Sequence, residues 1–86
     1  MYVILVYDVA VERNAKVLKL CRRYLHWVQN SVLEGELTEV QLQQLLAELK
    51  GLIRDSDSVI VFKFRQERWV DRTILGLQKG STESIL

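Results

Sequence analysis

The chain opens with an unbroken run of large apolar and aromatic residues, YVILVY (2–7), that ends at Asp8. A run this short, rich in β-branched and aromatic side chains and closed by a polar residue, predicts a β-strand. Because side chains alternate between the two faces of a strand, three of these residues face one way and three the other. Neither set contains a polar residue, so the strand requires apolar cover on both of its faces.

Two helices are predicted, and they can cover one of those faces. Apolar residues recur with helical spacing from about Val11 to Leu25, which predicts the first helix. The second helix is expected to begin at Thr38, where Gln41 completes a capping-box pattern three residues later. With 86 residues, the chain is expected to form a single domain over residues 1–86.

Further short strands are predicted between and after the helices. Residues 27–37 alternate and contain Gly35, which favours two short strands with a turn or bulge. Ser58–Phe64 and Thr73–Leu77 predict two more. The resulting order, βαββαβ with an additional C-terminal strand, is typical of the α+β ferredoxin-like fold, in which both helices lie on one face of an antiparallel sheet.

The other face of that sheet would remain bare in a single chain of this length. A second copy related by two-fold symmetry is the simplest cover, since such dimers are the commonest oligomers of soluble proteins. We therefore expect a homodimer with a core over about residues 1–65. The terminal strand, over about residues 73–78, is expected to take part in dimerisation.

Charge is distributed unevenly although the formal net charge is only +1. Five bases and no acid lie between Arg13 and Arg23, whereas residues 34–48 contain acids and no base. Lys16, Lys19 and Arg23 group on the side of the first helix opposite its apolar stripe, and Arg13 should project toward the end of the first strand. This basic stripe could contact phosphates, or it could be a solvated face.

Cysteine and hydropathy limit the class of protein. Cys21 is the single cysteine, so no internal disulfide or multi-cysteine metal site is expected, and a reducing cytoplasm is the simplest location. No apolar run approaches the roughly 20 residues of a membrane span, and the first residues do not resemble a signal peptide.

Three segments, YVILVYDV (2–9), ERNAKV (12–17) and VQNSVLEGEL (28–37), together resemble the small CRISPR-associated endonuclease family of spacer acquisition. Members typically open with an apolar strand that ends in Tyr-Asp and carry a Gln-x-Ser-Val-Phe-Glu-Gly type segment after the first helix. Here that segment is residues 29–35, with Leu33 where phenylalanine is usual. The segments 57–64 and 73–77 are similar to the family's last core strand and terminal strand, so the resemblance covers nearly the whole chain.

The resemblance implies a metal-dependent endonuclease acting on RNA or DNA in some members, and a scaffold beside the CRISPR integrase. Asp8 matches the family's acidic metal-binding position and is the expected catalytic residue and ligand of magnesium or manganese. Tyr7 is its neighbour, and Tyr7 and Ser31 are candidates for lying near the substrate. The expected nucleic-acid-binding residues are Arg13, Lys16, Lys19 and Arg23.

The partners expected from the resemblance are a second copy of the chain, the CRISPR integrase, and duplex DNA or single-stranded RNA. Neither a membrane nor a small-molecule cofactor is expected. The loop after Asp8 lacks the additional acids that many members carry there, which, like Leu33, puts the strength of catalysis in question more than the fold or binding.

The chemistry of magnesium points independently to the same position. Magnesium accepts as few as one or two carboxylates, with water completing its shell, so two copies of Asp8 brought together at a dimer axis would suffice. His26 is the single histidine, which leaves no histidine-based alternative.

Several alternatives remain open. Asp8 could cap the first helix, alone or in addition to binding metal. Glu34 and Glu36 are expected to face solvent, and Cys21 to be a core residue. At the level of function, the alternatives are a scaffold without catalysis, a toxin-type endoribonuclease of similar fold, and a non-catalytic ferredoxin-like regulatory module.

Overall fold

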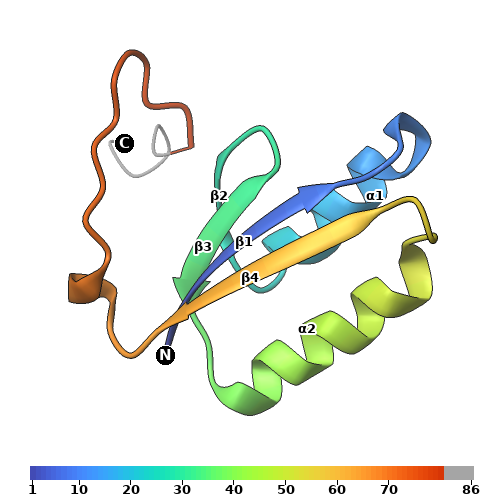
Figure 1. Ribbon diagram of the computed structural model, residues 1–86, viewed down its shortest axis with the longest axis horizontal. Coiled ribbons are helices and arrows are strands. Elements are labelled where there is room, and N and C mark those ends of the chain that lie inside the picture. Colours follow the sequence, from blue (N-terminus) through green and yellow to red (C-terminus); the bar gives the residue numbers. More distant parts are fainter. Residues whose placement is uncertain (81–86) are drawn as a thin grey trace.

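Strands and helices follow one another in the predicted order in the computed structural model, which describes residues 1–80 (Figure 1). Its elements are β1 (Tyr2–Asp8), α1 (Val11–Arg22), β2 (His26–Gln29), β3 (Val32–Glu36), α2 (Glu39–Leu52), β4 (Ser58–Phe64) and the 3-10 turn η1 (Glu67–Trp69). The strands form one antiparallel sheet in the order β2-β3-β1-β4. The predicted α+β fold is confirmed.

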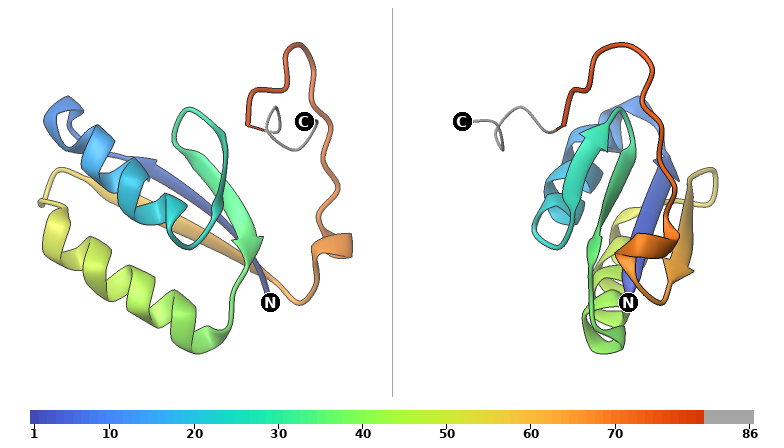
Figure 2. Two further views of the ribbon diagram at one scale, coloured as in Figure 1. Left: turned by 180° about the vertical axis from the view of Figure 1, so that it is seen from behind. Right: turned by 90° about the vertical axis from the view of Figure 1, so that its left-hand side faces the viewer.

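β1 occupies the centre of the sheet and pairs with β3 and β4 along its length. Val3 and Leu5 have no exposed surface, and with Tyr7 they face the side on which both helices pack (Figure 2). The rest of the main core comes from the apolar stripes of α1 and α2 and from β3: Val17, Leu20, Cys21, Leu25, Leu33, Leu37, Leu42, Leu45 and Leu49. One face of the strand is therefore covered as predicted.

Local sequence signals determine where α2 begins and how the chain turns before β3. The Thr38 side chain accepts a hydrogen bond from the Gln41 N–H, and the Gln41 side chain accepts one from the Thr38 N–H, so the predicted capping box is present. Asn30 adopts φ 44° in the β2–β3 turn, a left-handed conformation that asparagine tolerates. The two short strands predicted in residues 27–37 are present as β2 and β3, and the register shift between Trp27 and Gln29 adds a bulge in β2.

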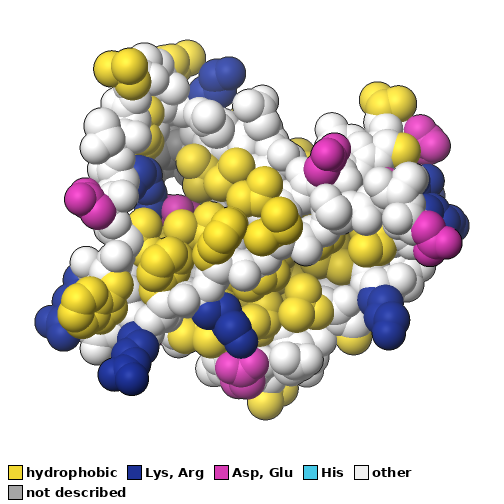
Figure 3. Space-filling model, in the orientation of Figure 1, with side chains coloured by type: hydrophobic (Ala, Val, Ile, Leu, Met, Phe, Trp, Pro, Cys, Tyr) yellow, Lys and Arg dark blue, Asp and Glu magenta, His cyan; other side chains and the backbone are white. Residues whose placement is uncertain are grey.

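The face of the sheet opposite the helices carries a patch of apolar side chains. Ile4 and Val6 of β1 lie beside Phe62 and Ile60 of β4, and Ile60 and Phe62 are 52% and 50% exposed. Figure 3 shows this apolar surface running across the middle of the molecule. We call the face that carries Ile4, Val6, Ile60, Phe62 and Phe64 the open face.

The segment after β4 differs from the prediction. Residues 73–77 are irregular and pair with no strand within residues 1–80. The segment instead runs beside β2 and β3 (Figure 1), where a Cβ on Gly80 would lie 2.0 Å from the carbonyl oxygen of Trp27. It is held there by an ion pair between Arg72 and Glu34.

Glu34 is consequently buried rather than facing solvent as predicted, because Arg72 and the terminal segment cover it. Glu36 is exposed and pairs with the N-terminal ammonium group. No helix within residues 1–80 combines the length and the hydropathy that crossing a membrane would require.

Candidate functional site at the end of β1

Asp8 is the last residue of β1, and its side chain is exposed. Alternation along the strand places it on the same face as Ile4 and Val6, which is the open face. The side chain of Asp8 takes no part in the hydrogen bonds and ion pairs found within residues 1–80. Its carboxylate is therefore available to a cation or a partner at the border of the apolar patch.

The alternative role of Asp8 as a helix cap is not what the structure shows. The residue before α1 is Ala10, which provides no side-chain cap. The Ala10 N–H donates instead to Oδ1 of Asp57, at 3.0 Å, from the loop between α2 and β4. Asp57, rather than Asp8, therefore accepts the hydrogen bond from the backbone N–H at the start of α1.

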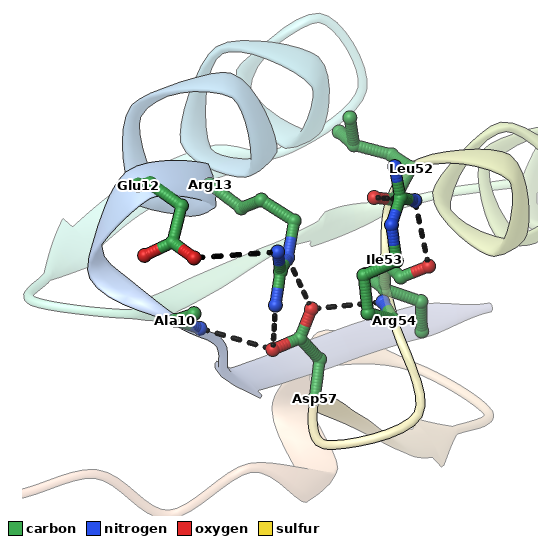
Figure 4. Close-up of polar contacts among 7 residues, drawn as sticks. All are labelled: Ala10, Glu12, Arg13, Leu52, Ile53, Arg54 and Asp57. Atoms are coloured by element: carbon green, nitrogen blue, oxygen red, sulfur yellow. Dashed lines mark hydrogen bonds and ion pairs between the residues drawn. The ribbon is translucent and has the colours of Figure 1, made fainter.

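Asp57 is the centre of a polar cluster that lies on the helix side of the sheet, where the α2–β4 loop meets the β1–α1 loop (Figure 4). Arg13 donates to it through Nε at 2.6 Å and through a terminal nitrogen at 3.0 Å, and the Arg54 N–H donates at 2.9 Å. The side chains of Asp57 and Arg13 are 1% and 17% exposed. The hydrogen bonds from Arg13, together with those from the backbone of Arg54 and Ala10, hold the pKa of Asp57 well below its usual range.

The basic residues of α1 are not equivalent. Arg13 is bound to Asp57, and Arg23 pairs with Glu48 of α2, whose other oxygen accepts from the Tyr24 hydroxyl. Acids outside residues 13–23 therefore pair with Arg13 and Arg23. Lys16 and Lys19 are exposed. Contact between these residues and phosphates stays a prediction.

Tyr7 is buried in the interior of the domain. It faces the helices with 3% exposure, its hydroxyl has no hydrogen-bond partner within the described residues, and burial raises its pKa. The structure thus places Tyr7 in the core, because alternation sends it to the face opposite Asp8, and its place near a substrate stays a prediction. Ser31 lies next to the end of β1, since its carbonyl accepts the Tyr7 N–H at 3.1 Å.

Cys21 is fully buried, as predicted, and burial raises the pKa of its thiol to about 11. A thiol with so high a pKa is protonated at neutral pH, so it is a poor nucleophile or metal ligand. It belongs to the core.

One exposed carboxylate, that of Asp8, is the oxygen donor that a single chain offers at the end of β1. Residues 1–80 contain no group of three or more histidine, cysteine, aspartate or glutamate side chains arranged to hold a metal ion. The exposed carboxylate of Asp8 is the kind of oxygen donor that magnesium and manganese prefer. Its position fits these ions only if a second chain contributes its own copy.

Comparison with known proteins identifies the family. The family model described as CRISPR associated protein Cas2 matches residues 1–72. The chain belongs to the Cas2 family. This confirms the resemblance found in the opening strand, the first helix and residues 28–37.

Relatives in the Cas2 family are similar over the full chain. The CRISPR-associated endoribonuclease Cas2 of Fusobacterium nucleatum is 47% identical over 92 residues, which cover all of this chain and 87% of that protein. The protein of the same name from Methanothermobacter thermautotrophicus is 48% identical over 87 residues, covering all of this chain and 96% of the relative.

Solved Cas2 structures share the fold. A chain described as the crystal structure of cas2 superposes with a TM-score of 0.86 at 47% identity, over 92% of this chain and 90% of the other. Streptococcus pyogenes Cas2 at pH 6.5 gives a TM-score of 0.71 at 30% identity, over 85% and 99% of the two chains. Sequence patterns did not reveal the ion pairs Arg13–Asp57 and Glu34–Arg72, whose members lie 44 and 38 residues apart.

Proposed function

We propose that this Cas2-family protein is a homodimeric, metal-dependent endonuclease that also serves as a scaffold for the CRISPR integrase in spacer acquisition. The observation that carries the proposal is the free, exposed carboxylate of Asp8 at the border of an uncovered apolar sheet face. Membership of the Cas2 family favours this function over a toxin-type endoribonuclease or a regulatory module.

Dimerisation is supported by the open face. Contiguous apolar side chains that remain half exposed are an aggregation liability unless a partner covers them. Around a two-fold axis, the patch of one copy can pack against the same patch of a second copy. Leu75 and Leu77 of the terminal segment are also largely exposed, and this segment could add to the free edge of the partner's sheet.

The symmetry that covers the open face would also complete the donor set. Asp8 shares a face with the patch, so two chains packed through that patch would each present one carboxylate at the border of the interface. Two carboxylates with water fit magnesium or manganese. When bound, such an ion neutralises phosphate charge and lowers the pKa of bound water.

The residues of the chain would do the remaining work. Asp8 is the last residue of a central strand, and the pairing of that strand restricts the backbone that carries the carboxylate. Lys16 and Lys19 on α1 supply positive charge that attracts a phosphate backbone without reading its bases. Relatives named endoribonuclease make single-stranded RNA the first substrate to test, with duplex DNA as the second.

A scaffold without catalysis is the second candidate. It is favoured by one observation, namely that each chain offers one exposed carboxylate here and that residues 9–11 carry no further acid. In that case the dimer would bind nucleic acid and integrase through its outer surfaces, and Asp8 would have no role in cleavage.

Cleavage of labelled single-stranded RNA and duplex DNA, with Mg²⁺ or Mn²⁺ and with chelator, tests the proposal. Asp8→Asn keeps the size of the side chain but removes the charge that a divalent cation requires, so cleavage should fall to background while dimerisation and nucleic-acid binding persist. Asp55→Asn, at an exposed carboxylate of the α2–β4 loop, is the matched control and should cleave like the wild type.

The outcomes separate the two candidates. Full metal-dependent cleavage by Asp8→Asn would overturn the catalytic proposal. A wild-type protein that cleaves neither substrate but binds the integrase would leave the scaffold function as the correct one.

A further inference from the structure

Asp57 links its own loop, between α2 and β4, to the β1–α1 corner, which lies 44 to 47 residues earlier in the sequence. Its carboxylate accepts hydrogen bonds from Ala10 in the β1–α1 loop, from Arg13 in the first turn of α1 and from the Arg54 N–H in its own loop (Figure 4). Four donors on one carboxylate that is 99% buried make a fully satisfied polar cluster rather than a loose surface contact. Such a cluster restricts the backbone that it touches.

The backbone that Asp57 restricts is the backbone that carries Asp8. Ala10 lies two residues beyond Asp8, and its N–H is bound to Asp57 at 3.0 Å. Ser58, which directly follows Asp57, is the residue opposite Asp8 in the β1–β4 register. Asp57 therefore fixes the chain both after Asp8 and across from it, although its own side chain lies on the helix side of the edge.

This restriction has a chemical consequence if Asp8 binds a divalent cation. Magnesium demands near-ideal geometry, and a site with one carboxylate per chain has no other protein ligand to correct a displaced one. Residues that orient a ligand from outside the first coordination shell typically change metal affinity by about 10- to 100-fold when mutated. At the turn from β1 to α1, nothing but Asp57 takes the place of a side-chain cap among the described residues.

We infer that Asp57 and Arg13 form a positioning pair that fixes the carboxylate of Asp8 for cation binding, an inference that rests on the proposed function of Asp8. The role of Arg13 in this pair is to orient and neutralise Asp57, since its guanidinium makes two hydrogen bonds to that side chain and is mostly buried. Arg13 is then not a phosphate contact of the kind expected of Lys16 and Lys19.

The test uses Mn²⁺ as a probe of the full-length protein and two variants of the pair. Asp57→Asn keeps the size of the side chain but replaces one accepting oxygen with an NH2 group, so the N–H donors that face that oxygen lose their acceptor. Arg13→Lys keeps the positive charge but loses the two-pronged geometry. Glu48→Gln is the matched control, because it weakens an ion pair from the other end of α1 that touches neither Asp8 nor its flanking residues. Folding of each variant is verified by circular dichroism at the assay temperature.

Three quantities are measured: the Mn²⁺ dissociation constant by calorimetry, the Mn²⁺ concentration giving half-maximal RNA cleavage, and solvent exchange of the Ala10 amide by NMR. Asp57→Asn should raise both Mn²⁺ concentrations by about 10- to 100-fold and accelerate exchange at Ala10. Cleavage at saturating Mn²⁺ should recover most of its rate, which a merely unfolded fraction would not do. Arg13→Lys should show a smaller change in the same direction, and Glu48→Gln none.

The outcomes distinguish this inference from the proposed function. If Asp8→Asn abolishes Mn²⁺ binding while folded Asp57→Asn binds Mn²⁺ like the wild type, Asp57 is not a positioning residue and the inference is overturned. If Asp57→Asn does not fold, Arg13→Lys decides, and wild-type Mn²⁺ affinity in that variant overturns the inference. If Asp8→Asn leaves Mn²⁺ binding unchanged, the proposed function fails, and the inference fails with it.

Discussion

The two faces of the sheet both carry large apolar side chains of β1, but these side chains end in different environments. On the helix side, Val3 and Leu5 are fully buried by α1 and α2, whereas on the open side Ile60 and Phe62 keep about half of their surface exposed. The same alternation divides the charges at the end of β1, with the buried cluster of Asp57 on the helix side and free Asp8 on the open side.

This difference suggests that the helix side of the sheet determines the stability of the fold and that the open side determines interactions with partners. The helix side completes the core within one chain, so changes there should act on folding. The open side has half-exposed apolar side chains on β4 and the exposed carboxylate of Asp8, which pairs with no side chain within residues 1–80, so changes there should act on association and chemistry.

The largest effect is expected from a truncation on the helix side. Leu5→Ala removes a fully buried side chain from the centre of the core, which should lower the free energy of unfolding by about 2–5 kcal/mol. Urea unfolding measures it. A loss no larger than that of an exposed residue would show that the helix side does not carry the core.

The corresponding truncation on the open side should act on dimerisation instead. Phe62→Ala removes a half-exposed ring, so the circular-dichroism spectrum should be retained while the dimer dissociation constant rises by about 30-fold, as for a central interface residue. Analytical ultracentrifugation over a dilution series gives this constant. An unchanged constant would place the interface elsewhere.

The buried aspartate predicts a pH dependence that belongs to the helix side. The pKa of Asp57 is lower in the folded chain than its ordinary value of about 3.9, chiefly because of hydrogen bonds from Arg13. Its stabilising contribution is therefore present above about pH 4 and is lost as the pH falls below that value.

Asp57→Asn removes this contribution, so the difference in unfolding free energy between wild type and variant should be constant from pH 7 to about pH 5 and shrink below about pH 4. Urea unfolding at a series of pH values measures this difference. A difference that grew on acidification would contradict the assignment of the buried charge.

The smallest effect is expected from the exposed bases of α1. If Lys16 and Lys19 each contact one phosphate, replacing both with glutamine should reduce the slope of log affinity against log salt by about 1.8 for duplex DNA. Fluorescence anisotropy across salt concentrations gives the slope. An unchanged slope would make this stripe a solvated face.

Local patterns were sufficient to predict most of the fold. Alternating and helical spacing located β1, β4 and the two helices, and the Thr38–Gln41 pair located the start of α2. The position of Asp8 at the end of a central strand followed from the same patterns. Each of these features depends on residues that are close in sequence.

The remaining features depend on partners that are distant in sequence. Arg13 lies 44 residues from Asp57, and Glu34 lies 38 residues from Arg72, so neither pairing leaves a local pattern. The terminal segment reads as a strand because of TILGL (73–77), but a strand forms only where an edge pairs with it.

The stoichiometry of Mn²⁺ binding tests the central claim most directly, which is that the open face joins two copies of Asp8 into one site. Calorimetric titration of the dimer should give one Mn²⁺ ion for two chains, and Asp8→Asn should give none. One ion for each chain, or an unchanged titration in Asp8→Asn, would contradict the account, because the carboxylates would then act separately or not at all.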